Sequence, residues 1–127
     1  MVVLSGVDEI IRKFDDLESS MNMHLGKVDK PLIVDIILRQ KSEKTNNLLY
    51  TLEVFIKPNQ DTQAIRNRIV SETGMSPAFY DQGTHIVVAH KLDFKMLKMI
   101  NDIDFVERIR GTYVGAGGAS IGATYDR

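Results

Sequence analysis

The sequence contains no cysteine and no tryptophan. Without cysteine the chain can form no disulfide framework, no thiolate zinc site and no cysteine nucleophile. The missing tryptophan also disfavours recognition of quaternary amines, because its ring is the best partner for such cations.

The chain also lacks a long apolar run. The longest candidate, Pro31 to Leu38, is interrupted by Asp35, and a bilayer span needs roughly 18 apolar residues. The N-terminus has no positively charged region, and acids begin at Asp8, which is unlike a secretory signal peptide. We therefore expect no membrane partner and a cytoplasmic location.

The positive and negative side chains of the sequence are nearly equal in number. The net charge of −1 and the pI near 6.3 are unlike the basic excess of a dedicated nucleic-acid binder. With 127 residues, 43% of them apolar, the chain is long enough for a core of its own. We expect a single domain over residues 1–127, and the balanced charge argues against a dedicated nucleic-acid binder.

The first apolar pattern is helical. Apolar residues recur at spacings of three and four, which predicts an amphipathic helix over 7–21; they are Val7, Ile10, Ile11, Phe14, Leu17 and Met21. Ser5 is placed to cap this helix, and Asp8 and Glu9 fall in its first turn, where the helix dipole favours acids. Such a helix must dock its apolar face on something.

Two β-type patterns follow. Leu32 to Arg39 is short and rich in β-branched residues, and Leu48 to Lys57 alternates between apolar and polar positions. A polar loop joins them, so we expect two strands in an antiparallel hairpin. Pro58 ends the second strand because proline cannot continue a hydrogen-bonded ladder.

Capping and turn residues mark where the remaining helices and strands begin and end. Asp61 or Thr62 begins a helix that ends before Gly74, and Asp93 begins a second helix with Phe94, Leu97, Ile100 and Ile103 on its buried side. Between them we expect a short edge strand in residues 76–81, a turn at Gln82-Gly83 and a strand over 84–92. A closing strand covers 105–114.

This order predicts an α+β fold. From Leu48 onward the elements read strand, helix, strand, strand, helix, strand, which is typical of the ferredoxin-like split β-α-β sandwich (βαββαβ) with both helices on one face. Residues 1–49 add an N-terminal helix and an extra strand, residues 50–114 form the ferredoxin-like core, and residues 115–127 form a flexible Gly/Ala-rich tail.

We do not expect the glycine-rich tail to form a phosphate site. Gly115 and Gly117 follow a strand, but Ser120 stands where a dinucleotide fingerprint needs its third glycine, and no helix can follow. No lysine follows Lys98, which excludes a Walker loop. Ser120 matches the G-x-S-x-G spacing but lacks the helix that a nucleophile elbow requires. We therefore expect no nucleotide cofactor.

The titratable residues suggest no catalytic or metal site either. His85 and His90 lie five apart on one predicted strand, so their side chains point to opposite faces and cannot share a metal ion. Asp102, Asp104 and Glu107 cluster beside lysine and arginine, as in a solvated charge mixture. We expect no metal, no cofactor and no enzymatic activity.

Residues 50–113 resemble the propeptide domain of subtilisin-like serine proteases, the inhibitor I9 family. The stretches that carry the resemblance are YTLEVFIK, AIRNRIVSETG, THIVVAHKL and LKMINDIDFVERI. The resemblance implies an intramolecular-chaperone or inhibitor function, in which the open sheet face packs on the protease and the segment after the last strand enters the active-site cleft. The partner-binding residues that it implies are Glu107, Arg110, Gly111, Thr112, Tyr113, Val114 and Gly115.

Two other functions remain open. One is a small intracellular regulator that forms a homo-oligomer through its sheet and binds a small ligand. The other is RNA binding, which would use aromatic residues on the two central strands; Phe55 fits, but the strand over 84–92 contains no aromatic ring at the expected positions.

Overall fold

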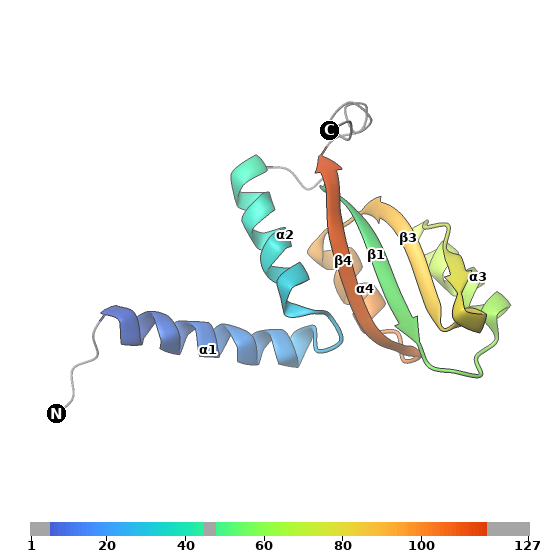
Figure 1. The fold of residues 1–127 in the computed structure, drawn as a ribbon, viewed down its shortest axis with the longest axis horizontal. Coiled ribbons are helices and arrows are strands. Elements are labelled where there is room, and N and C mark those ends of the chain that lie inside the picture. The colour runs from blue at the N-terminus through green and yellow to red at the C-terminus, as the bar shows by residue number, and fades with distance from the viewer. Residues whose placement is uncertain (1–5, 45–47, 117–127) are drawn as a thin grey trace.

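The computed structural model describes residues 6–44 and 48–116 of the chain, and it has an α+β fold (Figure 1). Two helices come first, α1 (Gly6–His24) and α2 (Lys30–Glu43). They are followed by β1 (Leu48–Ile56), α3 (Thr62–Thr73), β2 (Ala78–Tyr80), a short 3₁₀ turn (Asp81–Gly83), β3 (His85–Lys91), α4 (Phe94–Asn101) and β4 (Val106–Ala116).

The strands form one four-stranded antiparallel sheet in the order β2-β3-β1-β4. β1 is central, with Leu52 opposite Val88 of β3 on one side and opposite Gly111 of β4 on the other. Buried and half-buried residues alternate along β1 without exception. The alternation predicted over 48–57 is therefore confirmed, and it gives the sheet one face turned to the core.

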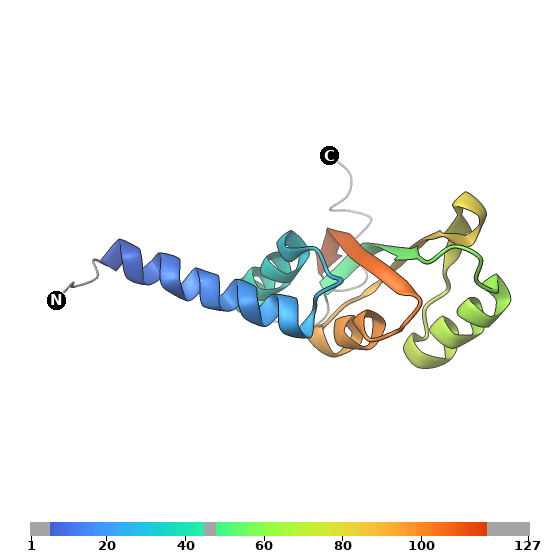
Figure 2. The same ribbon diagram turned by 90° about the horizontal axis from the view of Figure 1, so that it is seen from below.

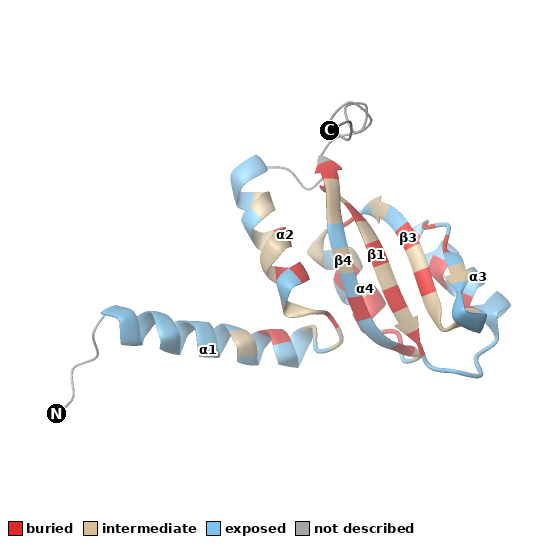
Figure 3. Ribbon diagram, in the orientation of Figure 1, coloured by how far each residue is buried: buried red, intermediate tan, exposed pale blue. Residues whose placement is uncertain are grey.

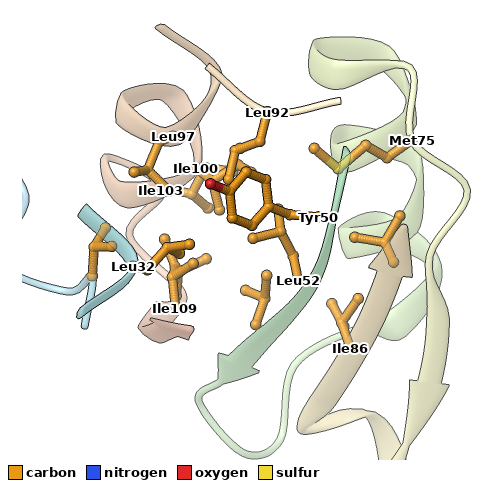
Figure 4. Packing of buried hydrophobic residues seen from close by; sticks show 14 of the residues in the cluster. Leu32, Tyr50, Leu52, Met75, Ile86, Leu92, Leu97, Ile100, Ile103 and Ile109 are labelled. Carbon is orange, nitrogen blue, oxygen red and sulfur yellow. The ribbon is translucent and has the colours of Figure 1, made fainter. Parts of the chain in front are cut away.

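That inner face is covered by α3 and α4, and α2 packs against it from the β4 edge, while the outer face carries no helix of the described residues (Figures 1 and 2). Apolar side chains from the strands and helices meet in one core (Figure 4). The ring of Tyr50 lies fully buried inside it, together with Leu52 of the same strand and Leu97 and Ile100 of α4.

The expected strand over Leu32–Arg39 and its hairpin with the next strand were wrong, because these residues form the middle of α2. Pro31 occupies the first turn, where its fixed φ suits a helix and its missing N–H costs nothing. Leu32, Ile33 and Ile36 are buried at helical spacing against the sheet. Tertiary burial on one helix side outweighs the modest helix penalty of β-branched residues. The fold therefore has two N-terminal helices in place of a helix and a strand.

The predicted starts of α3 and α4 and the predicted end of α3 are confirmed, whereas α4 stops at Asn101, so the buried Ile103 lies in the turn after the helix and not on it as expected. Asp61 Oδ1 accepts hydrogen bonds from the N–H groups of Gln63 and Ala64, and Asp93 Oδ1 accepts one from Met96. Gly74 ends α3 with φ of 75°, the left-handed conformation that glycine adopts without steric cost. The cap expected at Ser5 lies outside the described residues.

The edges of the sheet agree in part with the predictions. β2 is the expected short edge strand, and the chain turns into β3 at Gln82 and Gly83, which both have positive φ. β4 continues to Ala116, so the described chain stays paired beyond the predicted end at Val114. Residues 117–127 of the predicted tail lie outside the described residues. No helix among those described is both long enough and apolar enough to span a bilayer.

The predicted N-terminal helix forms as α1, but its docking differs from the expectation. Only Met21 of its apolar stripe is buried, and the turns before it project from the rest of the chain (Figures 1 and 3). For most of its length the apolar stripe is therefore exposed to solvent.

Candidate protein-binding surface

The uncovered face of the sheet carries a cluster of aromatic and charged side chains. Its members come from all four strands, and we call them the open-face cluster: Glu53, Phe55, Tyr80, His85, Arg108 and Arg110. β1 contributes from the centre of the sheet, and β4 contributes from its edge. In the register of the sheet, Phe55 pairs with His85 on one side and with Arg108 on the other.

Phe55 is the centre of this cluster. Its ring stacks on the imidazole of His85, with centroids 4.8 Å apart and planes 5° from parallel. The guanidinium carbons of Arg110 and Arg108 lie 5.3 Å and 5.9 Å from the centroid of the Phe55 ring. The ring of Tyr80 lies 6.1 Å from that of His85. An aromatic ring bordered by guanidinium groups presents apolar area and hydrogen-bond donors side by side.

Glu53 balances the positive charge of the cluster. Its two carboxylate oxygens accept hydrogen bonds of 3.0 Å and 3.1 Å from Nε and a terminal nitrogen of Arg110, and Oε1 lies 3.0 Å from Nε2 of His85. These hydrogen bonds, that from Arg110 first, lower the pKa of Glu53 below its ordinary value. Glu53 therefore stays ionised and holds both neighbours in place across three strands.

Arg108 forms the same kind of contact with Asp29, which lies on the side of β4 away from β1. Its Nε and a terminal nitrogen donate to the two oxygens of Asp29 at 2.9 Å and 2.8 Å, and this lowers the pKa of Asp29. The segment before α2 also pairs with β4, since Val28 forms a parallel bridge with Ile109. Both arginines of the cluster are thus fixed by bidentate carboxylate contacts, the geometry that guanidinium groups form most specifically.

The predicted partner-binding residues all lie in β4 and divide between its two sides. Arg110 and Thr112 are exposed on the outer face, and Glu107 is exposed near the start of the strand. Gly111 and Tyr113 face inward opposite Leu52 and Tyr50, while Val114 and the buried Gly115 precede the end of the strand. The resemblance implied a segment beyond the last strand, whereas the described residues from Arg110 to Gly115 are part of that strand.

The inward part of β4 borders a groove of about 330 Å³ between β4 and α2. Asp35 Oδ2 accepts hydrogen bonds of 2.7 Å from the Tyr50 hydroxyl and 2.9 Å from Nε of Arg39. The guanidinium carbon of Arg39 lies 3.6 Å from the centroid of the Tyr113 ring. Burial, together with the hydrogen bond to Asp35, raises the pKa of Tyr50. The polar groups named here form hydrogen bonds with one another. Their contacts attach α2 to the sheet, and none of these residues is left unpaired as a candidate catalytic group.

The residues considered as metal ligands are separated. His85 belongs to the open-face cluster, where it contacts Glu53. His90 lies elsewhere, with its Nδ1 atom 2.8 Å from the carbonyl oxygen of Lys91. Asp102 accepts hydrogen bonds from Lys98 and Asn101, and Asp104 pairs with Arg68. Within residues 6–44 and 48–116, no three histidine or acidic side chains gather where they could hold a metal ion.

Sequence patterns identified Phe55 but did not predict its surroundings. Glu53, His85 and Arg108 come together only because the strand order places β3 and β4 on either side of β1. The sequence shows only that these residues occupy the polar positions of strands in which apolar and polar residues alternate. That pattern does not reveal which strands are neighbours in the sheet.

Comparisons of the chain with protein-family models, curated protein sequences and solved structures found no match.

Proposed function

We propose that the chain is a non-enzymatic protein-binding module, in which residues 48–116 form a ferredoxin-like sandwich and the open sheet face docks on a partner protein. The observation that carries this proposal is the open-face cluster, with Phe55 stacked on His85 and bordered by two arginines on a face that no helix of the described chain covers. The ferredoxin-like assignment is supported by the element order and by the strand order β2-β3-β1-β4.

The composition of the cluster suits a protein partner. Aromatic residues and arginine dominate the binding energy of protein interfaces, and Lys and Glu are depleted there. Glu53 and Asp29 hold the two arginines before any partner arrives, so little side-chain freedom is lost on binding. A preorganised face of this kind fits a rigid protein surface.

The specific form that we propose is a stand-alone inhibitor or chaperone of a subtilisin-type serine protease. The support is the resemblance over residues 50–113, together with an open sheet face and a β4 strand at the sheet edge. In this form Arg110 and Thr112 contact the protease from the outer face, and Glu107 lies near the start of the same strand.

A protease titration tests this form. We expect micromolar protein to slow peptide hydrolysis by a subtilisin-type protease, and we expect Phe55→Ala and Arg110→Ala to weaken inhibition at least about tenfold, as hot-spot truncations do. Val70→Ala is the matched control, because Val70 is an exposed apolar residue on α3, in the opposite layer. An unchanged hydrolysis rate would rule out the inhibitor form, and equal inhibition by Phe55→Ala would rule out the open face.

The RNA alternative has one structural observation in its favour, the aromatic pair of Phe55 and His85 on the two central strands. Both arginines, however, already pair with carboxylates, which leaves little positive charge for phosphates. We therefore expect no shift in the fluorescence anisotropy of a labelled single-stranded RNA at micromolar protein. A shift that Phe55→Ala abolishes would replace the protein-binding proposal.

A further inference from the structure

Strand β4 has an outer edge that is only partly paired. Near its start, the N–H of Ile109 donates to the carbonyl oxygen of Lys27 at 2.8 Å, and the N–H of Asp29 donates to the carbonyl oxygen of Ile109 at 2.9 Å. Beyond Ile109, no described segment except β1 forms a backbone hydrogen bond with β4. Within residues 6–44 and 48–116, the outer edge is therefore open from Gly111 to Ala116.

The main-chain groups along this open edge point away from β1 at regular intervals. Both groups of Ile109 do so, and in an antiparallel ladder every second residue of a strand points the same way. Gly111 and Tyr113 therefore also turn their N–H and C=O groups outward. After the register shift of the ladder Ala116 does the same, because Leu48 opposite to it turns its carbonyl toward the β3 side of β1. Such a row of groups is a template for a further strand.

A groove of about 330 Å³ runs along this open edge, between β4 and α2. Pro31 and Leu32 line it from α2, and Gly111 and Tyr113 line it from β4. Figure 1 shows α2 lying beside β4. A neighbouring strand lies about 4.8 Å from β4. Because Gly111 has no side chain, the groove suits a strand of small residues.

We propose that the chain's own residues 119–124 fill this groove and pair antiparallel with β4 as a fifth strand. β4 ends at Ala116, and Gly117 and Gly118 follow it directly. A Gly-Gly pair is a strong signal for a two-residue hairpin turn, because the favoured turns need positive φ. The residues after the turn are small except for Ile121. The site is the sheet edge and not the open-face cluster, so this proposal is independent of the proposed function.

The hairpin turn determines the register of the added strand. A two-residue turn makes Ala116 and Ala119 the hydrogen-bonded pair that closes it, and the main-chain groups of Ala116 already point outward. Val114 is the extra residue of β4 at the register shift. The next hydrogen-bonded pair along the edge is therefore Tyr113 with Ile121.

This register places each side chain of the added strand where the groove can accept it. Residues directly opposite each other share a face of the sheet, so Ile121 lies on the inner side with Tyr113 and enters the groove beside Leu32. Ala123 lies opposite Gly111, where its methyl group meets no side chain from β4. The largest apolar residue of the segment is thus buried, and the smaller ones pass the narrow part.

The length of the open edge limits the added strand. The next outward residue of β4 is Ile109, and its main-chain groups already pair with Lys27 and Asp29. The added strand therefore stops at Thr124, opposite Arg110. The segment before α2 and residues 119–124 then share the outer edge of β4 without overlap, and the edge is no longer free to pair with another chain.

Disulfide trapping in the full chain tests the register. The sequence contains no cysteine, so an introduced pair is the only one that can form. Thr112→Cys with Gly122→Cys creates a non-hydrogen-bonded pair, whose Cα separation of about 4.5 Å permits a disulfide. We expect mild oxidation to link this pair within one chain. Thr112→Cys with Ala123→Cys is the matched control and should stay reduced, because successive side chains of a strand point to opposite faces.

The other outcomes of this experiment would overturn the proposal. Equal linking of the two pairs would mean that the segment has no fixed register on β4. Linking of neither pair would mean that the segment does not reach the edge. Links between chains, seen as a dimer on a non-reducing gel, would assign the edge to a second copy.

Amide hydrogen exchange measured by NMR tests the pairing without introduced cysteines. The amides of Gly111 and Tyr113 should exchange slowly, because the added strand accepts hydrogen bonds from both. Gly117→Val disfavours the positive φ of the turn and should speed their exchange at least about tenfold. Gly122→Val makes the same change within the strand, where β-branched residues are favoured, and should not speed it.

Unchanged exchange of the β1 amides in both variants would show that the rest of the sheet is intact. Rapid exchange of Gly111 and Tyr113 in the unmodified chain would overturn the proposal, since it would leave the edge open. An equal effect of Gly117→Val and Gly122→Val would overturn it as well, because the turn would then have no special role.

Discussion

The Tyr50 hydroxyl donates a hydrogen bond of 2.7 Å to Oδ2 of Asp35, and this contact joins the central strand β1 to helix α2. Tyr50 is fully buried, and its ring meets that of Tyr113 edge to face at 5.4 Å. Asp35 also accepts from Arg39 one turn later in α2. The three groups fix where α2 lies on the sheet.

Replacing Tyr50 by phenylalanine removes the hydroxyl and keeps the ring. We expect Tyr50→Phe to lower the free energy of unfolding by about 1 kcal/mol, because a part-buried carboxylate loses one of its donors. Tyr80→Phe, at an exposed tyrosine, should change it by less than about 0.5 kcal/mol. Urea denaturation of the variants checks both values, and equal stabilities would show that the hydroxyl contributes nothing.

The raised pKa of Tyr50 also predicts that the folded chain loses stability at alkaline pH. Burial and the Asp35 carboxylate raise the pKa of Tyr50 in the folded chain, so the folded state keeps a proton that the unfolded chain releases. Stability is therefore fully present below the ordinary tyrosine value of about 10 and falls as the pH rises above it. The urea midpoint should fall less steeply with pH in Tyr50→Phe than in the wild type. Parallel slopes above that pH would contradict this assignment.

The carboxylates that hold the two arginines, Glu53 and Asp29, predict how the stability of the chain changes in acid. Hydrogen bonds from Arg110 and Arg108 lower the pKa values of Glu53 and Asp29 in the folded state. The folded state then binds fewer protons than the unfolded chain, so this stabilisation is present at neutral pH and is lost as the pH falls below about 4.

Glu53→Gln tests the acid prediction, because it removes the titrating group and keeps the shape. We expect the variant to be less stable at neutral pH and to lose less stability between about pH 5 and pH 3. Glu107→Gln, at an exposed acid on β4, is the control. Denaturation midpoints at each pH provide the measurement, and identical pH profiles for all three proteins would refute the role of Glu53.

The packing of α3 gives a core prediction. Ile69 is buried, whereas the adjacent Val70 is exposed. Ile69→Ala should lower the free energy of unfolding by about 2–5 kcal/mol through lost burial and the remaining cavity. Val70→Ala should cost less than about 0.5 kcal/mol. Thermal and chemical denaturation compare the two, and a near-zero effect at Ile69 would mean that α3 faces the sheet with another side.

Gly111 gives a prediction about close approach. A Cβ atom at this position would lie 3.0 Å from Leu52 Cδ2, 3.2 Å from the Thr51 carbonyl oxygen and 3.3 Å from Leu32 Cδ1. Gly111→Val should therefore destabilise the chain by about 1–3 kcal/mol by forcing α2 away from β4. Thr112→Val, one position along on the open face, should be close to neutral. Melting temperatures check the pair, and an unaffected Gly111→Val would show that α2 yields freely.

Local patterns in the sequence determined the elements whose signals lie within a few residues. The alternation along Leu48–Lys57, the caps at Asp61 and Asp93 and the stop at Gly74 act through neighbouring backbone groups, so they could be read without knowing the fold. The helical spacing of α1 belongs to the same class.

Tertiary structure decided what depends on partners distant in the sequence. Leu32–Arg39 has the composition of a strand, but burial of Leu32 and Ile36 against the sheet makes it a helix. The contact of Phe55 with His85 and Arg110 exists because β1 pairs with both β3 and β4. Side-chain periodicity shows which residues share a face of one element, whereas only packing determines which elements that face meets.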